Sequence, residues 1–177
     1  MKTLRTDRLI LRQWTESDVD FVFDMYSRWE VQQYIGLTPR VMEDRSEAVA
    51  LIDRLRALDD PICGRWAVES AASGGLTGMI LLKPIPASGR QDPLLPSGDI
   101  EIGWHFHPAS WGRGFATEAA AVVLAHAFAS GLDRVVAVTN PRNIASQKVC
   151  TRIGMRHEGQ TTRYYNATCE LFTASAP

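Results

Sequence analysis

Two closely spaced glycines lie in the segment that is most informative about chemistry. Gly112 and Gly114 occur in Trp-Gly-Arg-Gly-Phe-Ala-Thr-Glu, residues 111–118, directly before an alanine-rich stretch that predicts a helix. Glycine lets the backbone approach a ligand closely, and a helix start offers free N–H groups and the positive end of its dipole. Arg113 adds a local cation. The segment therefore predicts a phosphate site, although a tight turn that needs glycine would also explain the glycines alone.

The spacing of these glycines disfavours two common phosphate-binding motifs. It is not G-x-x-x-x-G-K-[ST], which disfavours a P-loop ATPase, and it is not G-x-G-x-x-G, which disfavours a dinucleotide site. A generic nucleotide-phosphate binder stays open at this point, because glycines and one cation do not define the rest of the ligand.

A strand and a helix position this loop. Residues 99–106 alternate, which is typical of a strand with two different faces. One face carries Ile100, Ile102, Trp104 and Phe106, and the other carries Asp99, Glu101, Gly103 and His105. The helix after the loop is expected to run to about Ala129, with Gly131 as its stop.

The rest of the chain predicts a mixed sheet covered by helices on both faces. A capping box at residues 15–18 predicts a helix start. Residues 27–40 are expected to form a loop or a short helix, and residues 84–98 a surface loop. Further helices are expected at about 43–58 and 143–153. Strands are expected at residues 8–13, 65–69, 75–82, 134–139, 155–159 and 163–172, the last with an irregular centre.

Composition bounds the class of protein. The 177 residues favour one domain, residues 1–177, and a net charge of −1 gives no global field for nucleic acid or an anionic membrane. Three cysteines without metal-type spacing predict free thiols in a reducing compartment and no metal site. The first residues lack the apolar core of a signal peptide, so a soluble, cytoplasmic protein is expected.

The order and spacing of four segments resemble the GNAT superfamily of acyl-CoA-dependent N-acyltransferases. These segments are residues 101–106, 111–119, 143–146 and 153–155. Residues 4–12 are similar to the branch that includes the ribosomal-protein N-terminal acetyltransferases, and the resemblance extends from about Leu4 to Phe172. It implies a single-domain α/β (α+β mixed) fold. Its mostly antiparallel sheet would splay between the fourth and fifth strands, residues 99–106 and 134–139.

The resemblance also implies where acetyl-CoA binds. The family's pyrophosphate loop has Gln or Arg, two residues, Gly, one residue, then Gly or Ala; it falls on residues 111–116, with Trp111 in place of Gln or Arg. Pantetheine would pair with backbone near Phe106 and His107, and Asn143 and Ser146 would contact its end. The loop residues implied to bind coenzyme A are Trp111, Gly112, Arg113, Gly114, Phe115, Ala116 and Thr117.

Acyl transfer to an amine needs a proton acceptor, an oxyanion donor and a proton for the leaving thiolate. Glu101 matches the family's frequent acidic position and is the candidate base, acting directly or through water; it could instead hold the ammonium or make a structural hydrogen bond. Cys150 occupies the place of the family's Tyr and is a candidate acid or a small core residue. Ser146 is the other candidate acid, with binding as its alternative role.

Acceptor contacts are harder to derive from the sequence. His105 shares a face with Glu101 and is a candidate second base, substrate contact or structural residue. Other aromatic candidates for the acceptor mouth are Trp29, Tyr34 and Trp66, each of which could instead belong to the core, and, before the last strand, Tyr164 and Tyr165.

The expected reaction is transfer of an acetyl group from acetyl-CoA to a primary amine by direct attack in a ternary complex. The acceptor could be a protein N-terminus, an amino acid, a polyamine or an antibiotic-like amine, and the enzyme a monomer or a homodimer. The alternative is a coenzyme A-binding regulatory module without turnover.

Overall fold

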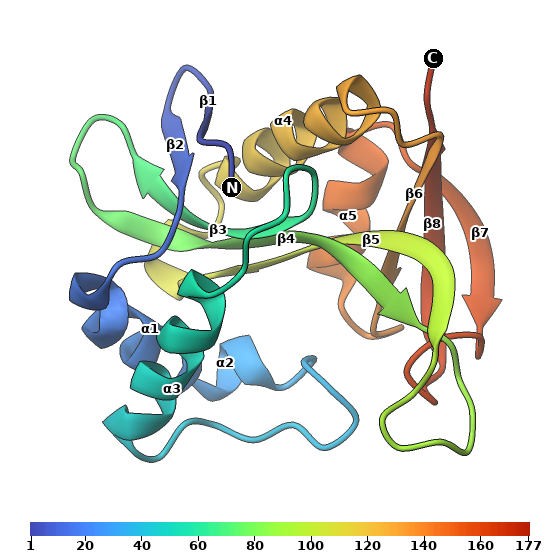
Figure 1. The fold of residues 1–177 in the computed structure, drawn as a ribbon, viewed down its shortest axis with the longest axis horizontal. Coiled ribbons are helices and arrows are strands. Elements are labelled where there is room, and N and C mark those ends of the chain that lie inside the picture. The colour runs from blue at the N-terminus through green and yellow to red at the C-terminus, as the bar shows by residue number, and fades with distance from the viewer.

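The computed structural model describes all 177 residues, which form an eight-stranded sheet with helices on both faces (Figure 1). The strand order is β1-β2-β3-β4-β5-β6-β8-β7. The strands are β1 (Leu4–Arg5), β2 (Leu9–Arg12), β3 (Gly64–Ser70), β4 (Leu76–Pro86), β5 (Pro96–Phe106), β6 (Arg134–Thr139), β7 (Arg156–Thr161) and β8 (Cys169–Ser175). The helices are η1 (Glu16–Asp18), α1 (Val19–Tyr26), α2 (Trp29–Gln32), α3 (Arg45–Arg56), η2 (Pro108–Ser110), α4 (Phe115–Ala129) and α5 (Ile144–Arg152).

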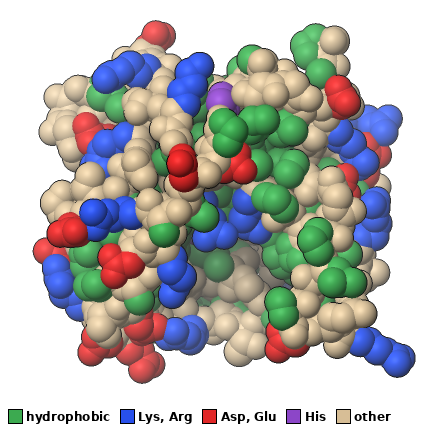
Figure 2. Space-filling model, viewed as in Figure 1, with side chains coloured by type: hydrophobic (Ala, Val, Ile, Leu, Met, Phe, Trp, Pro, Cys, Tyr) green, Lys and Arg blue, Asp and Glu red, His purple; other side chains and the backbone are tan.

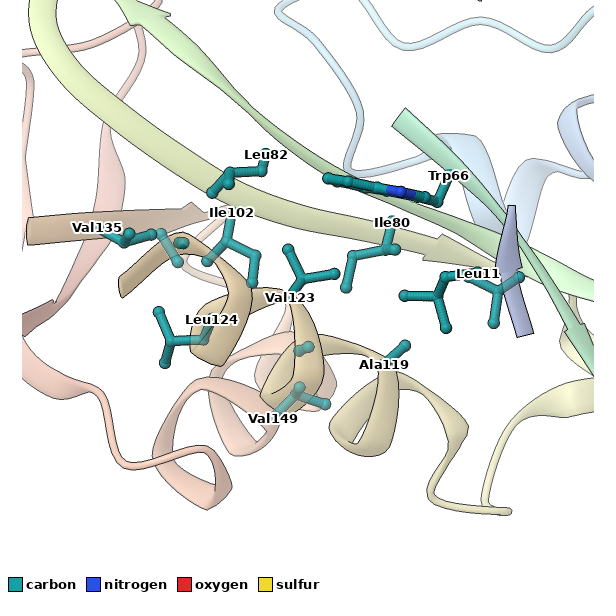
Figure 3. Close-up of a cluster of buried hydrophobic side chains, with 14 of the residues drawn as sticks. Leu11, Trp66, Ile80, Leu82, Ile102, Ala119, Val123, Leu124, Val135 and Val149 are labelled. Atoms are coloured by element: carbon teal, nitrogen blue, oxygen red, sulfur yellow. The ribbon is translucent and has the colours of Figure 1, made fainter. Parts of the chain in front are cut away.

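The two sheet faces carry different helices. Helices α4 and α5 lie on one face, and α1, α2 and α3 lie on the other (Figure 1). The α4 face holds the larger core; its side chains in Figure 3 include Leu11, Trp66, Ile80, Leu82, Ile102, Ala119, Val123, Leu124, Val135 and Val149. The second core joins α1 and α3 to Ala67, Met79 and Leu81. Each fully buried Leu, Ile or Val contributes about 1.5–3 kcal/mol to these cores.

The sheet splays between β5 and β6, as expected. The parallel pair β5–β6 has one register pair, Glu101 with Val136, whereas β4–β5 is paired from Gly78–Phe106 to Pro86–Pro96. Backbone groups of β5 beyond Glu101 therefore have no strand partner on the β6 side. Glu101 lies at the point where the two strands separate.

Local signals placed most element ends correctly. The capping box at Thr15 is present before α1, and Asp44 caps α3 with its side chain on the Ser46 N–H. Gly131, with φ of 90°, follows the end of α4. Residues 27–40 contain the short helix α2.

Three segments differ from the expectation. Residues 84–98, expected as a loop, extend β4 to Pro86 and start β5 at Pro96, with a register shift between Pro84 and Pro86 that accommodates proline. Strand β8 begins only at Cys169, because Tyr165 and Asn166 adopt positive φ in a turn. Strand β1 has two residues, too few for periodicity to reveal. No helix of the structure is long and apolar enough to cross a membrane.

Candidate active site

The glycine loop adopts a conformation that requires glycine. Gly112 and Gly114 have φ of 73° and 79°, in the left-handed region, and Gly114 is the N-cap of α4. No side chain caps this helix start, so its first N–H groups face outward without a side-chain partner. An added Cβ at Gly112 would meet nothing within 4 Å, which leaves backbone conformation as the reason for glycine there.

A cluster of polar contacts holds the loop against the turn between β1 and β2. The Arg8 guanidinium lies 2.5 Å from the Glu118 carboxylate and donates to the Arg113 carbonyl at 3.0 Å. Thr6 donates to Glu118 at 2.5 Å, and these contacts together hold the pKa of Glu118 below its usual value despite its partial burial. Glu118 therefore fixes the helix start that carries the loop.

A cavity of about 370 Å³ adjoins this loop. Arg113 and Phe115 form one side of it, and the β1–β2 turn and the end of β3 form the other. Its lining residues are Asp7, Arg8, Ser70, Ala71, Ala72, Arg113 and Phe115. Two arginines beside an uncapped helix start make this a place suited to a phosphate-bearing group.

Some backbone groups at the end of β5 already make hydrogen bonds within the chain. The His107 N–H donates to the Thr77 carbonyl at 3.0 Å, on the β4 side. Along an antiparallel strand, the backbone N–H and C=O groups of successive residues point alternately to the two neighbouring strands. Because those of His107 point toward β4, those of Trp104 and Phe106 point toward the splay. There the Phe106 carbonyl accepts from the Trp111 indole at 2.8 Å, while the Trp111 side chain is otherwise half-exposed. The His107 imidazole pairs with Asp24 at 2.9 Å.

The candidates near α5 have distinct environments. Asn143 caps α5 by accepting from the Ser146 N–H at 3.1 Å, and the Ser146 hydroxyl has no hydrogen-bond partner in the chain. Cys150 is fully buried within the larger core, where desolvation raises its pKa to about 12. The Cys150 thiol is therefore protonated and enclosed by apolar side chains.

Glu101 is held by two side chains from distant parts of the chain. Its Oε1 lies 2.6 Å from the Lys83 ammonium and accepts a hydrogen bond from the Tyr165 hydroxyl. Lys83 also donates to the Tyr165 hydroxyl at 2.6 Å. No hydrogen bond of the chain reaches Oε2, although Glu101 is only 6% exposed. The carboxylate is thus oriented through one oxygen, and the other is left for a ligand.

A strained turn positions Tyr165. Tyr165 and Asn166 have φ of 58° and 54°, which costs energy for residues other than glycine. Asn166 and Gly89 exchange hydrogen bonds of 2.9 and 3.1 Å, which fasten the turn to the loop between β4 and β5. Of the two neighbouring tyrosines, Tyr165 reaches Glu101, while Tyr164 is 1% exposed and donates to Asp99 at 2.6 Å.

His105 is a neutral residue on the Glu101 face. Its Nδ1 lies 2.7 Å from the Tyr26 hydroxyl, and the two rings make an edge contact. Burial, together with the charge of Arg65, lowers the pKa of His105 to about 4. A group with this pKa is a weak base at neutral pH, so the geometry favours hydrogen bonding over proton uptake.

Of the first three aromatic candidates, Trp66 is a core residue, fully buried on the α4 side of the sheet, and the other two lie farther out. Trp29 is 55% exposed on α2, and Tyr34 is half-buried in the segment that follows; neither side chain has a hydrogen-bond partner. No group of three or more His, Cys, Asp or Glu side chains is arranged to hold a metal ion.

Three residues of this face were not predicted from the sequence. They are Tyr26 of α1, Arg65 of β3 and Lys83 of β4. The strand register Arg65–Leu81–Gly103 and Lys83–Glu101 places the two basic residues on the Glu101 face, and Tyr26 reaches it through its contact with His105. The one available signal was the charge of Arg65 and Lys83 inside otherwise apolar strands. Alternation alone cannot show which strands become neighbours.

Comparison with known proteins gives the family. The family model described as "Acetyltransferase (GNAT) domain" matches residues 8–156. The uncharacterized N-acetyltransferase YoaA of Bacillus subtilis is 34% identical over 163 residues, covering 91% of this chain and 86% of the relative. The FsC-acetyl coenzyme A-N(2)-transacetylase of Aspergillus fumigatus is 29% identical and covers 88% and 65% of the two chains.

A solved structure shows the same fold. RimL, a ribosomal L7/L12 alpha-N-protein acetyltransferase in complex with coenzyme A, superposes with a TM-score of 0.75 over 99% of this chain and 98% of that chain, at 15% identity. Three findings indicate the same family: the splayed sheet, the glycine loop before α4, and the family model that matches most of the sequence. The chain belongs to the GNAT family of acetyltransferases.

Proposed function

We propose that the enzyme transfers an acetyl group from acetyl-CoA to a primary amine by direct attack, with both substrates bound at once and Glu101 accepting the amine proton. One observation carries the proposal. Glu101 lies where β5 and β6 separate, its Oε1 is held by Lys83 and Tyr165, and its Oε2 has no hydrogen-bond partner. The free oxygen is thereby pre-positioned for a proton on an incoming amine.

The cofactor half of the proposal rests on backbone geometry. Residues 112–117 would bind the pyrophosphate through the uncapped start of α4, with Arg113 nearby, and the neighbouring cavity would take the adenosine end. The backbone of Trp104, which points into the splay without a strand partner there, would pair with pantetheine, and Asn143 and Ser146 would contact its end. When bound, acetyl-CoA supplies the acetyl group as a thioester.

Two sheet faces would then contribute to one reaction. The glycine loop precedes α4 on one face of the sheet, and alternation along β5 places Glu101 on the opposite face, because Ile102 and Phe106 lie in the α4-side core. Helices α1, α2 and α3 cover that opposite face (Figure 1). The splay is the opening through which ligands on the two faces can meet. Holding both in place converts a bimolecular step into an effectively unimolecular one, and positioning of this kind supplies much of an acyl transferase's rate.

The side chains around Glu101 have separate tasks in this proposal. Lys83 and Tyr165 orient the carboxylate, and the Tyr165 hydroxyl keeps its proton because burial and Glu101 raise its pKa. His105 acts as a neutral hydrogen-bonding group oriented by Tyr26. For the proton of the leaving thiolate, the partner-free Ser146 hydroxyl is a better candidate than Cys150, which is enclosed in the core.

The relatives support an amine acceptor and differ in its kind. RimL is named as acting on a ribosomal protein and the Aspergillus enzyme as an N(2)-transacetylase of FsC. Both names describe acetylation, one of a protein and one of another acceptor. The chemistry shared with this chain is acetyl transfer.

A thiol-release assay with acetyl-CoA and a panel of primary amines tests the proposal. The panel contains peptide N-termini, amino acids, polyamines and aminoglycosides, and calorimetry measures coenzyme A binding in competition with ATP and NAD. We expect turnover with at least one class and a preference for coenzyme A. Tight coenzyme A binding without release for any amine would instead indicate a binding module, and preference for ATP or NAD would overturn the cofactor assignment.

A further inference from the structure

We infer that the amine acceptor carries a carboxylate, and that Arg65 binds it; this rests on the proposed function and specifies its substrate class. Arg65 is a half-buried basic side chain on the Glu101 face that no group of the chain neutralises, whereas the unpaired Arg5 and Arg54 are exposed. Its guanidinium has no ion pair and no hydrogen bond. A half-buried cation without a partner is costly unless a ligand supplies the opposite charge.

Strand register places Arg65 on this face. Trp66 and Val68 of β3 lie in the α4-side core and Ala67 lies in the other, so Arg65 points toward α1 and α3. Its charge acts on three side chains there, because it lowers the pKa of His105 and opposes the rise in the pKa of Tyr26 and Tyr165. Arg65 thus lies on the same face as Glu101, close enough to His105, Tyr26 and Tyr165 to influence their protonation.

The charge balance of the four side chains considered for this site favours an anion. Arg65 and Lys83 are cationic, Glu101 is anionic, and His105 is neutral at pH 7, which leaves one positive charge in excess among these four. The next carboxylate along β5, Asp99, already lies 3.6 Å from Arg134 and 3.5 Å from Arg163. A plain ammonium would be repelled by this surplus. An amine that carries a carboxylate would balance it.

The geometry fits one small molecule. Arg65 pairs with Leu81 and Leu81 with Gly103, so Arg65 is two strand spacings, about 10 Å, from β5. Gly103 lies between Glu101 and His105 on this face, and the Leu81 side chain packs over it, 3.3 Å from where a Cβ would stand, so a ligand that joins Glu101 to Arg65 would lie across Leu81. Figure 2 shows the molecule hollowed below β4 and β5, with Lys and Arg side chains on the wall of the hollow. The amine would lie at Glu101 and the carboxylate at Arg65.

Matched acceptor pairs test this inference in the thiol-release assay. Each pair differs only in carboxylate against carboxamide: α-amino acids and their amides, β-alanine and γ-aminobutyrate and their amides, and peptides beginning Ser-Glu or Ser-Gln. We expect kcat/KM to be about 10- to 100-fold higher for the carboxylate in the preferred pair, as a charge-assisted hydrogen bond provides. The preferred pair shows whether the source is a free amino acid or an acidic peptide.

Variants of Arg65 connect the preference to this side chain. Arg65→Gln should abolish it, chiefly by raising KM for the carboxylate, with the carboxamide changed less than about threefold; Arg65→Glu should reverse it. Arg54→Gln, at an exposed arginine on α3 that also lacks partners, should change neither.

Two results would overturn the inference. Equal kcat/KM within every pair for the wild-type enzyme would overturn it while leaving acetyl transfer intact, and this comparison does not depend on any variant folding. An equal loss on both members in Arg65→Gln would also overturn it. Absence of turnover with every amine would remove the proposed function and the inference together.

Discussion

The two sides of the splay are built by different means. The cofactor side, residues 111–117 with the start of α4, presents backbone groups from one short segment. The acceptor side consists of side chains from α1, β3, β4, β5 and the turn before β8, and is defined by Tyr26, Arg65, Lys83, Glu101, His105 and Tyr165. Under the proposed function, the conformation of one loop would control binding of the cofactor, while several replaceable side chains would control the choice of acceptor.

Substitution should therefore have different consequences on the two sides. A changed loop backbone should weaken coenzyme A binding whatever the acceptor. A changed side chain on the acceptor side should alter kcat or acceptor KM while coenzyme A still binds.

Glu101→Gln should produce the largest effect on turnover. Loss of the proton acceptor should lower kcat by about 100- to 1000-fold, within the range of general base catalysis, with the acetyl-CoA Kd changed less than about twofold. Steady-state kinetics and calorimetry measure the two quantities. Glu69→Gln is the matched control, since Glu69 is also an ion-paired glutamate on the sheet, 2.7 Å from Arg12. Wild-type kcat in Glu101→Gln over pH 6–9 would remove Glu101 as the base.

Gly114→Val should weaken coenzyme A binding by about 10-fold or more, because valine cannot adopt φ of 79° without strain and adds bulk at the pyrophosphate. Gly131→Val is the control, since Gly131 has φ of 90° at the other end of α4. Both variants should lower the Tm, and only Gly114→Val should lower the affinity. Equal affinities in the two folded variants would place the pyrophosphate elsewhere.

Tyr165→Phe should lower kcat by about 10-fold, because Glu101 loses a hydrogen bond that orients it, and a bond to a charged group is worth about 1.5–3 kcal/mol. Coenzyme A binding should not change. Tyr164→Phe removes the hydroxyl that donates to Asp99 and compares the two neighbouring tyrosines directly. A larger loss of kcat in Tyr164→Phe than in Tyr165→Phe would contradict the assignment of Tyr165 to the acceptor side.

Acidification should destabilise the acceptor side through His105. Its pKa is lowered from 6.5 to about 4 in the folded protein, so between these values the unfolded state binds the extra proton. Stability from this group is complete above pH 6.5 and declines as the pH falls toward 4. Tm measured across this range should fall less in His105→Gln than in the wild-type protein. If the Tm of the two proteins fell by the same amount over this pH range, the lowered pKa of His105 would be refuted.

The same contrast explains what the sequence could predict. The loop, α4 and the alternating strand before it were predictable because capping, glycine and periodicity act within a few residues of one another. Lys83 and Arg65 were not predictable, since only the register of three strands places them on the same face as Glu101. The choice of Tyr165 over Tyr164 depends on a turn with positive φ that Asn166 and Gly89 stabilise, a contact between residues far apart in the chain.

A crystal structure of the enzyme with coenzyme A would test the meeting of the two sides most directly. We predict the pyrophosphate on the N–H groups of residues 112–117, pantetheine between β5 and β6, and the sulfur beside the free Oε2 of Glu101. Coenzyme A bound outside the splay, or a sulfur on the far side of β5 from Glu101, would contradict the account.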